Sequence, residues 1–305
     1  MSDAIIQHAP SLPQSQSSVP AVRSPRPAWL RWTRHWQFHL SVAVLAVVIV
    51  SAALAPWLTA FDPNGIDLGS ALQAPSPAHW FGTDQLGRDV LSRTMFGARL
   101  SLFIAFCAVF LAGCGGTLIG ILSAYFGGWI DSVTMRLADI QYSLPPVILA
   151  MVVIGVIGPN TANVIIVVTI ANWARFARVI RAEALSIKHR DYVLLARLAG
   201  ASPLRVALRH ILPNVRNTFL VLLTLDIGLI IILEAALSFL GLGVQPPDPS
   251  WGTMISDGRG QLEHAWWTSV MPGIVMMLTV LAANLAGDHL RDGAGSGTRL
   301  IGEAD

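Results

Sequence analysis

The sequence predicts an all-α integral membrane protein with six transmembrane helices. Only 12% of its 305 residues are Asp, Glu, Lys or Arg, whereas a typical soluble domain has roughly 25%. Apolar residues make up 53% of the chain, and its mean hydropathy is +0.59. This composition excludes a disordered chain and disfavours an ordinary water-soluble enzyme, because long uncharged segments are typical of membrane spans.

The N-terminal region predicts a tail, one span and an external loop. Residues 1–35 are rich in Ser, Pro, Gln and Arg without an apolar period, which predicts a flexible cytoplasmic tail. The first uncharged run is 40–61, and we expect a retained span followed by an external loop, together covering 36–98. A cleaved signal peptide is the alternative, because Ala53-Leu54-Ala55 resembles a cleavage site, but the run exceeds the roughly 7–15 residues of a signal's apolar region.

Five more spans are expected in residues 99–292, which form the predicted core. The first of them covers 100–130. The next uncharged run, 140–174, is interrupted by Gly158-Pro159-Asn160, which predicts two spans joined by a tight turn. Pro145-Pro146 is expected to begin the first of these two spans. The last two spans are 217–243, which is apolar except for Asp226 and Glu234, and 265–287. A flexible tail is expected at 293–305.

The distribution of basic residues sets the orientation, because Lys and Arg accumulate on the cytoplasmic side of bacterial membrane proteins. The chain has 20 Lys and Arg residues. With the N-terminus inside, only four of them fall in external segments: Arg88, Arg93, Arg99 and Arg259. Both termini and the loop at 183–215 are therefore predicted to be cytoplasmic.

The loop at 183–215 predicts two short helices. The first covers 190–199 and ends before Gly200, which suits the left-handed residue that follows many helices. The second is capped by Ser202 and ends near Ile211. Their apolar faces consist of Tyr192, Leu195 and Leu198, and of Leu204, Leu208 and Ile211. Charge alone allows these helices to rest simply on anionic lipid.

The spacing of this loop resembles the coupling loop of ATP-binding-cassette (ABC) importer permeases. That pattern is Glu-Ala-Ala, three residues, Gly, nine residues, Ile, one residue and Leu-Pro. The ATPase-coupling residues that the match predicts are Ala196, Gly200, Ala201, Leu212 and Pro213. Leu194 stands where the pattern has Glu, and His210 stands where it has Ile.

Further motifs resemble one subfamily, the C-type permease subunit of dipeptide, oligopeptide and nickel importers. Its first external loop matches at Phe81, Gly82, Thr83, Asp84, Gly87, Arg88 and Asp89. Other matching segments are 234–243, Pro246-Pro247 with Ser250-Trp251-Gly252, and Asn284-Leu285 with Gly287-Asp288. The resemblance covers about residues 40–292, and it makes the external loop a brace near a docked binding protein. Asp84, Arg88, Asp89 and Arg93 are spaced for ion pairs along a helix, and a solvated loop is the alternative to the brace.

The resemblance implies a type I ABC importer permease fold, in which a cytoplasmic helix pair couples to separate ATPase subunits. Expected partners are a second permease in a heterodimer, two ATPases that bind ATP-Mg, an extracytoplasmic substrate-binding protein and membrane lipid, without nucleic acid. The chain itself is expected to bind no cofactor or metal and to be no enzyme, since it lacks a P-loop. Di- or oligopeptides are the expected cargo, with nickel complexes, glutathione and opines as alternatives, and the bacterial inner membrane is the expected location.

Several residues leave two interpretations open. Asp226 and Glu234 could line a pathway that attracts a peptide amino group or a metal ion, or they could form hydrogen bonds between helices. Gly116 and Gly120, in a small-xxx-small spacing, could contact the partner permease or pack within the chain. The pair Trp266-Trp267 fits a membrane interface.

Two other function classes are disfavoured. A secondary transporter or channel would leave the basic loop without a role, and the sequence shows no evident internal repeat. A membrane-embedded enzyme would need a nucleophile and a base inside the bilayer, and no Gly-x-Ser-x-Gly motif or metal cluster is present in the sequence.

Overall fold

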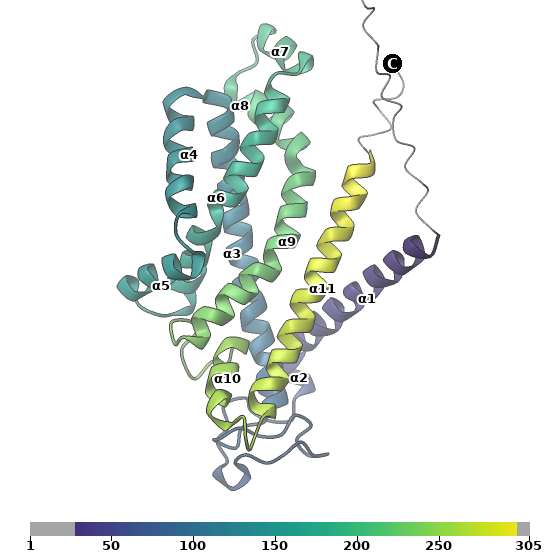
Figure 1. Cartoon of the computed structure of the whole chain (residues 1–305), viewed down its shortest axis with the longest axis vertical. Coiled ribbons are helices and arrows are strands. Elements are labelled where there is room, and N and C mark those ends of the chain that lie inside the picture. The colour runs from purple at the N-terminus through teal and green to yellow at the C-terminus, as the bar shows by residue number, and fades with distance from the viewer. Residues whose placement is uncertain (1–27, 298–305) are drawn as a thin grey trace, which may run out of the picture.

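The computed structural model describes residues 28–297, with side chains described for residues 36–291. This part of the chain is a helical bundle without a named strand, and its one β-bridge joins Thr83 to Asp89. Five helices are long and apolar enough to cross a membrane, and a sharply bent helix pair supplies a sixth candidate span. The predicted all-α, multi-pass architecture is confirmed (Figure 1).

The first span, α1 (Ala28–Ala53), begins and ends earlier than the sequence predicts. Its backbone is already helical within the segment expected to be a tail, and the short α2 (Ala55–Leu58) follows directly. The expected end near Phe61 is wrong, because the chain leaves the helix at Thr59, which has an extended backbone. The rest of the predicted N-terminal tail, residues 1–27, lies outside the described residues.

The second span, α3 (Val90–Phe126), starts well before the expected residue 100. The carboxylate of Asp89 accepts a hydrogen bond of 2.7 Å from the Ser92 amide and so caps the first turn. The hydrophobicity pattern missed this turn because it holds the charged Arg93. At its other end the helix stops at Gly127, which has a positive φ of 65°.

The predicted third span is not a straight helix. The chain forms α4 (Gly128–Tyr142) and α5 (Pro146–Ile157), which meet at 95°. Pro145 and Pro146 explain the break, because proline removes an amide donor and disfavours a helical conformation in the residue before it. The expected start of this span at Pro145-Pro146 matches the start of α5, whereas residues 140–142 belong to α4. Twelve residues of α5 extend about 18 Å, less than the hydrocarbon thickness of about 30 Å, so α5 alone is too short to cross the membrane.

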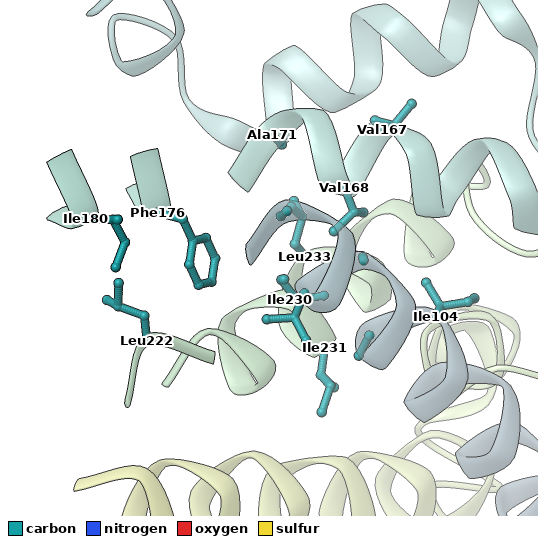
Figure 2. Packing of buried hydrophobic residues seen from close by; sticks show 14 of the residues in the cluster. Ile104, Val167, Val168, Ala171, Phe176, Ile180, Leu222, Ile230, Ile231 and Leu233 are labelled. Atoms are coloured by element: carbon teal, nitrogen blue, oxygen red, sulfur yellow. The ribbon is translucent and has the colours of Figure 1, made fainter. Parts of the chain in front are cut away.

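Three helices form the centre of the bundle: α3, α6 (Thr161–Lys188) and α9 (Leu212–Phe239). Figure 2 shows their buried side chains meeting, with Ile104 from α3, Phe176 from α6 and Ile231 from α9 all 0% exposed. This packing sets the positions of the cytoplasmic loop and of the charged residues of α6 and α9 relative to α3.

Gly116 and Gly120 of α3 lie directly against α6. A Cβ atom on Gly116 would stand 2.4 Å from the carbonyl oxygen of Trp173, and one on Gly120 would stand 2.5 Å from that of Ala177. The absence of side chains therefore lets the two backbones approach each other closely. Of the two interpretations of this motif, packing within the chain is the one that the structure shows.

The last span, α11 (Trp267–Gly297), packs against α9 and α1. It extends past residue 292, so the start of the expected C-terminal tail is helical, while residues 298–305 lie outside the described residues. Figure 1 shows the start of α1, the end of α11 and the helix α7 (Asp191–Leu198) toward the same end of the bundle. Helix α10 (Trp251–Gly258) lies at the opposite end of the bundle from α7.

Candidate functional site

The predicted coupling loop contains α7 and a sharp turn stabilised by a Schellman motif. The amide of Gly200 donates to the carbonyl of Arg197 at 2.9 Å, and the amide of Ala201 donates to the carbonyl of Ala196 at 3.0 Å. Gly200 has a φ of +83° and no other atoms within 4 Å of an added Cβ. Three of the predicted coupling residues thus belong to one turn, and its glycine is required by backbone conformation rather than by close packing.

The second coupling helix does not end at Ile211. Ser202 caps α8 (Pro203–Val206) by accepting a bond from the Arg205 amide, as predicted, and the chain continues through a π-turn, η2 (Ala207–Ile211), into α9. Pro213 lies in the first turn of α9. The expected break before it is wrong, because the wider π-turn accommodates the missing amide and the ring of proline without ending the helix.

The apolar residues of the loop divide into two groups. Val193, Val206 and Ile211 are 0% exposed and hold the loop on the bundle. Leucines on the other side stay exposed, most of all Leu198 at 84%. The other exposed leucines of the loop are Leu194, Leu195, Leu204, Leu208 and Leu212. An exposed group of this kind at a bundle end indicates a surface for a protein partner.

Two basic residues attach the loop to the end of α3 through contacts that no sequence pattern predicts. Lys188 Nζ donates to the carbonyls of Ala124 and Tyr125, at 2.9 and 2.7 Å. The Arg197 guanidinium lies 4.9 Å from the centre of the Tyr125 ring. Carbonyls in the last turn of a helix lack partners within it, so Lys188 also caps α3.

A cavity of about 530 Å³ lies at the elbow between α4 and α5, bordered by α6 and α9. Most of its lining is apolar, and Arg175 is the only charged residue in the lining. Arg175 Nη1 lies 2.7 Å from Oδ1 of Asp226, whose side chain is 1% exposed. Of the two candidate pathway residues, Asp226 is therefore close to the cavity but behind Arg175.

Glu234 lies in a different environment, between α9, α3 and the start of α10. Its side chain is 0% exposed and accepts hydrogen bonds from Ser101 Oγ at 2.9 Å and Ser238 Oγ at 2.7 Å. The Trp251 amide also donates to Ser101 Oγ. This geometry matches the interhelical hydrogen-bonding interpretation, and Glu234 does not border the cavity.

The external motif folds into a compact, buried structure. Asp84 accepts from the amides of Leu86 and Arg88 and pairs with the Arg88 side chain at 2.7 Å, and Arg93 Nε lies 3.6 Å away. Asp89 pairs with His79 at 2.9 Å while it caps α3. The expected pair of Asp84 with Arg88 is present, in a turn preceding α3 rather than along one helix, whereas Asp89 pairs with His79.

Two glycines allow this external turn to close. A Cβ on Gly87 would stand 1.7 Å from the Asp67 carbonyl oxygen, and one on Gly82 would stand 2.6 Å from Nε1 of Trp267. That indole also donates to the carbonyl of Thr83 at 3.1 Å. Trp267 is 6% exposed, so it supports the external motif rather than facing the membrane interface. The remaining motif residue, Phe81, is partly buried and packs against a small apolar cluster that consists of Val90, Met254, Ala265 and Trp267.

The comparison with known families decides between the candidate classes. The family model described as the binding-protein-dependent transport system inner membrane component matches residues 116–294, more than half of the chain. The chain belongs to this permease family. A second family model, the N-terminal transmembrane domain of oligopeptide transport permease C, matches residues 26–75. This is a family of transport subunits and not of enzymes, so the prediction of a non-enzymatic ABC importer permease with a type I fold is confirmed.

Relatives of this permease resemble it over most of its length. A putative peptide transport system permease of Brucella abortus is 42% identical over 262 residues, covering 86% of this chain and 88% of the relative. The dipeptide transport system permease protein DppC of Alkalihalophilus pseudofirmus is 37% identical over 283 residues, with 93% of each chain covered. The glutathione transport system permease protein GsiD of Escherichia coli O1:K1 is 41% identical over 265 residues, covering 87% of this chain and 88% of the relative.

The described part of the permease offers no evident metal site, since no group of three or more His, Cys, Asp or Glu side chains is placed to hold an ion there. Its polar clusters instead join helices to one another.

Proposed function

We propose that this permease is one of two membrane subunits of an ATP-driven importer that moves peptides into the bacterial cytoplasm. Its expected partners are a second, different permease, two ATPases that bind ATP-Mg and an external substrate-binding protein. The inner membrane, with both termini in the cytoplasm, is the proposed location, supported by the distribution of Lys and Arg. Peptidic cargo is supported by relatives whose names specify peptides, dipeptides and glutathione.

One observation carries the coupling part of this proposal: the loop between α6 and α9 presents exposed leucines beyond the bundle end. Leu198 at its tip is 84% exposed, and Figure 1 shows α7 projecting past the neighbouring helices. An ATPase cleft would cover this surface. Burial of one leucine side chain contributes about 1.5–3 kcal/mol, so a few leucines are enough to fix a docking site.

Both ends of the loop continue into core helices, so a displacement of the docked loop would move α6 and α9 together. These two helices carry Arg175 and Asp226 and border the cavity. We therefore assign Ala196, Gly200 and Ala201 to the turn that shapes the docking surface. Leu212 and Pro213 form the junction that transmits its movement to α9.

The first experiment is purification of the tagged chain in mild detergent, followed by mass spectrometry. Recovery of a P-loop ATPase and a second permease supports the assembly, and recovery of the chain alone contradicts it. Uptake of the identified cargo into proteoliposomes should require ATP.

A pair of variants tests the docking surface in the same preparation. Leu198→Gln should release the ATPase, whereas Leu68→Gln, which alters a leucine that is 69% exposed at the opposite end, should not. Equal ATPase recovery with both variants would remove the loop from the docking role.

A further inference from the structure

The cavity at the α4–α5 elbow presents a positive charge, that of Arg175, whereas the sequence suggests a negative one from Asp226 and Glu234. Asp226 is 1% exposed, whereas the Arg175 side chain is 39% exposed and lines the cavity. A molecule that enters meets the guanidinium first. The ligand group that complements this surface is therefore an anion rather than an amino group or a metal ion.

Arg175 has donors left for such an anion. A guanidinium carries five N–H donors in a rigid plane, more than a single carboxylate can occupy, and the ion pair with Asp226 joins Nη1 to Oδ1. Among the described side chains, no other polar group pairs with Arg175. The remaining edge matches the planar, bidentate geometry of a carboxylate.

Two side-chain amides give the cavity acceptors as well. Asn172 Nδ2 donates to the carbonyl of Val168 at 2.7 Å, and Gln141 Nε2 donates to the carbonyl of Ala171 at 2.7 Å. Because each amide nitrogen donates to a backbone carbonyl, the side-chain carbonyl oxygens of Asn172 and Gln141 remain available to accept from a ligand. Asn172 and Arg175 are three residues apart on α6, so they share one helix face.

The rest of the lining suits apolar side chains. Val147 and Leu149 come from α5, and Leu229 and Ile232 come from α9. A volume of about 530 Å³ lies within the range of roughly 300–1,000 Å³ that is usual for small-molecule sites. An anionic group, amide N–H donors and apolar side chains within this size are the features of a short peptide.

We propose that Arg175 binds the C-terminal carboxylate of a short peptide in this cavity, while the peptide's N–H groups face Asn172 and Gln141. This inference rests on the proposed transport function, which it deepens by naming a contact on the translocation route. Asp226 acts as a positioning residue, because it holds the guanidinium and offsets its charge. A transport site has to release its cargo, so binding must stay weak.

The test is a direct binding measurement on the purified transporter complex without substrate-binding protein. Saturation-transfer NMR titrations would compare the dipeptide alanyl-phenylalanine with its C-terminal amide, which lacks the negative charge. The wild-type complex should bind the acid about tenfold more tightly than the amide, a difference of about 1.4 kcal/mol. Leaving out the binding protein removes its own preference from the comparison.

Variants assign this preference to Arg175. The double variant Arg175→Gln/Asp226→Asn avoids leaving a buried carboxylate unpaired, and it should bind acid and amide equally. Arg175→Lys should keep part of the preference. The control is Arg178→Gln, which removes an arginine one turn along α6 that pairs with Asp139 and does not line the cavity; its preference should stay at the wild-type value.

Equal binding of acid and amide by the wild-type complex would overturn the inference, as would no saturable binding of either probe or an unchanged preference in the double variant. ATP-dependent uptake of the native cargo, measured in the same preparation, separates this failure from failure of the proposed function. Uptake that persists without a carboxylate preference would contradict the Arg175 site and leave the proposed transport function intact.

Discussion

The Arg197 guanidinium of α7 lies 4.9 Å from the centre of the Tyr125 ring, in the last turn of α3. Lys188, at the end of α6, donates to the carbonyl of the same tyrosine at 2.7 Å. The coupling loop thus contacts α3, a helix that is not adjacent to it in the chain. A force on α7 would reach α3 directly through this contact, as well as α6 and α9 through the backbone.

Loss of the Tyr125 ring should weaken this attachment. Tyr125→Leu removes a cation–π contact of about 0.5–2 kcal/mol, and we expect a several-fold lower uptake per ATP hydrolysed in proteoliposomes. Tyr125→Phe keeps the ring and should retain wild-type coupling. If the leucine and phenylalanine variants couple equally well, the ring has no part in transmission.

Two substitutions of Gly200 test its two roles separately: the backbone conformation of the turn and the surface that the turn presents to the ATPase. A non-glycine residue at a φ of +83° costs about 1–2 kcal/mol, and asparagine tolerates this region best. Because an added Cβ meets no atom within 4 Å, Gly200→Asn should transport nearly normally. Gly200→Glu places a charge on the docking surface, and we expect ATPase activity without uptake. Normal coupled uptake by the glutamate variant would contradict the docking role.

Two adjacent glycines of α3 provide a matched test of the α3–α6 contact. A Cβ on Gly116 would stand 2.4 Å from the Trp173 carbonyl, whereas one on Gly115 meets nothing within 4 Å. Gly116→Val should therefore destabilise the bundle by about 1–3 kcal/mol through overpacking. Gly115→Val should be tolerated. Thermal unfolding in detergent measures both, and similar melting temperatures would show that the helices can separate without cost.

The external motif should fail when its central carboxylate is removed. Asp84 is 6% exposed and pairs with Arg88, and loss of one partner of a buried pair typically costs about 3–5 kcal/mol. Asp84→Ala should lower the yield of folded permease and expose segment 62–89 to added protease. Asp248→Ala alters an exposed residue of the other external segment and serves as the control. Equal protection in both variants would indicate that the motif is not held by this carboxylate.

Glu234 should act through hydrogen bonding rather than through its charge. Glutamine can still bond to the hydroxyls of Ser101 and Ser238, so Glu234→Gln should retain uptake. Glu234→Leu leaves both hydroxyls without this partner, at a cost of about 1–3 kcal/mol for each unsatisfied group. Melting temperature and uptake should fall together for the leucine variant. Loss of uptake in a stably folded glutamine variant would instead favour a role of the charge in the pathway.

Some features follow from short stretches of the sequence. Hydrophobic runs predict the five long spans and their order, because burial in lipid acts on each segment separately. The caps at Ser202 and the turn at Gly200 were predictable for the same reason, since hydrogen bonds of a helix end depend on neighbouring residues. The coupling-loop and external-loop motifs indicate the permease family from the sequence alone, because each is a short local pattern.

Other features depend on residues that are distant in the chain. Hydrophobicity could not show that α4 and α5 bend by 95°, since it does not register how proline redirects a helix. Nor could it show that Arg175 stands between Asp226 and the cavity, that Gly116 contacts α6, or that Glu234 joins α3 to α9. Burial and charge pairing arise only when separate helices pack together, so the chemistry of each site was decided by the tertiary structure, whereas the long apolar segments were already set by the sequence.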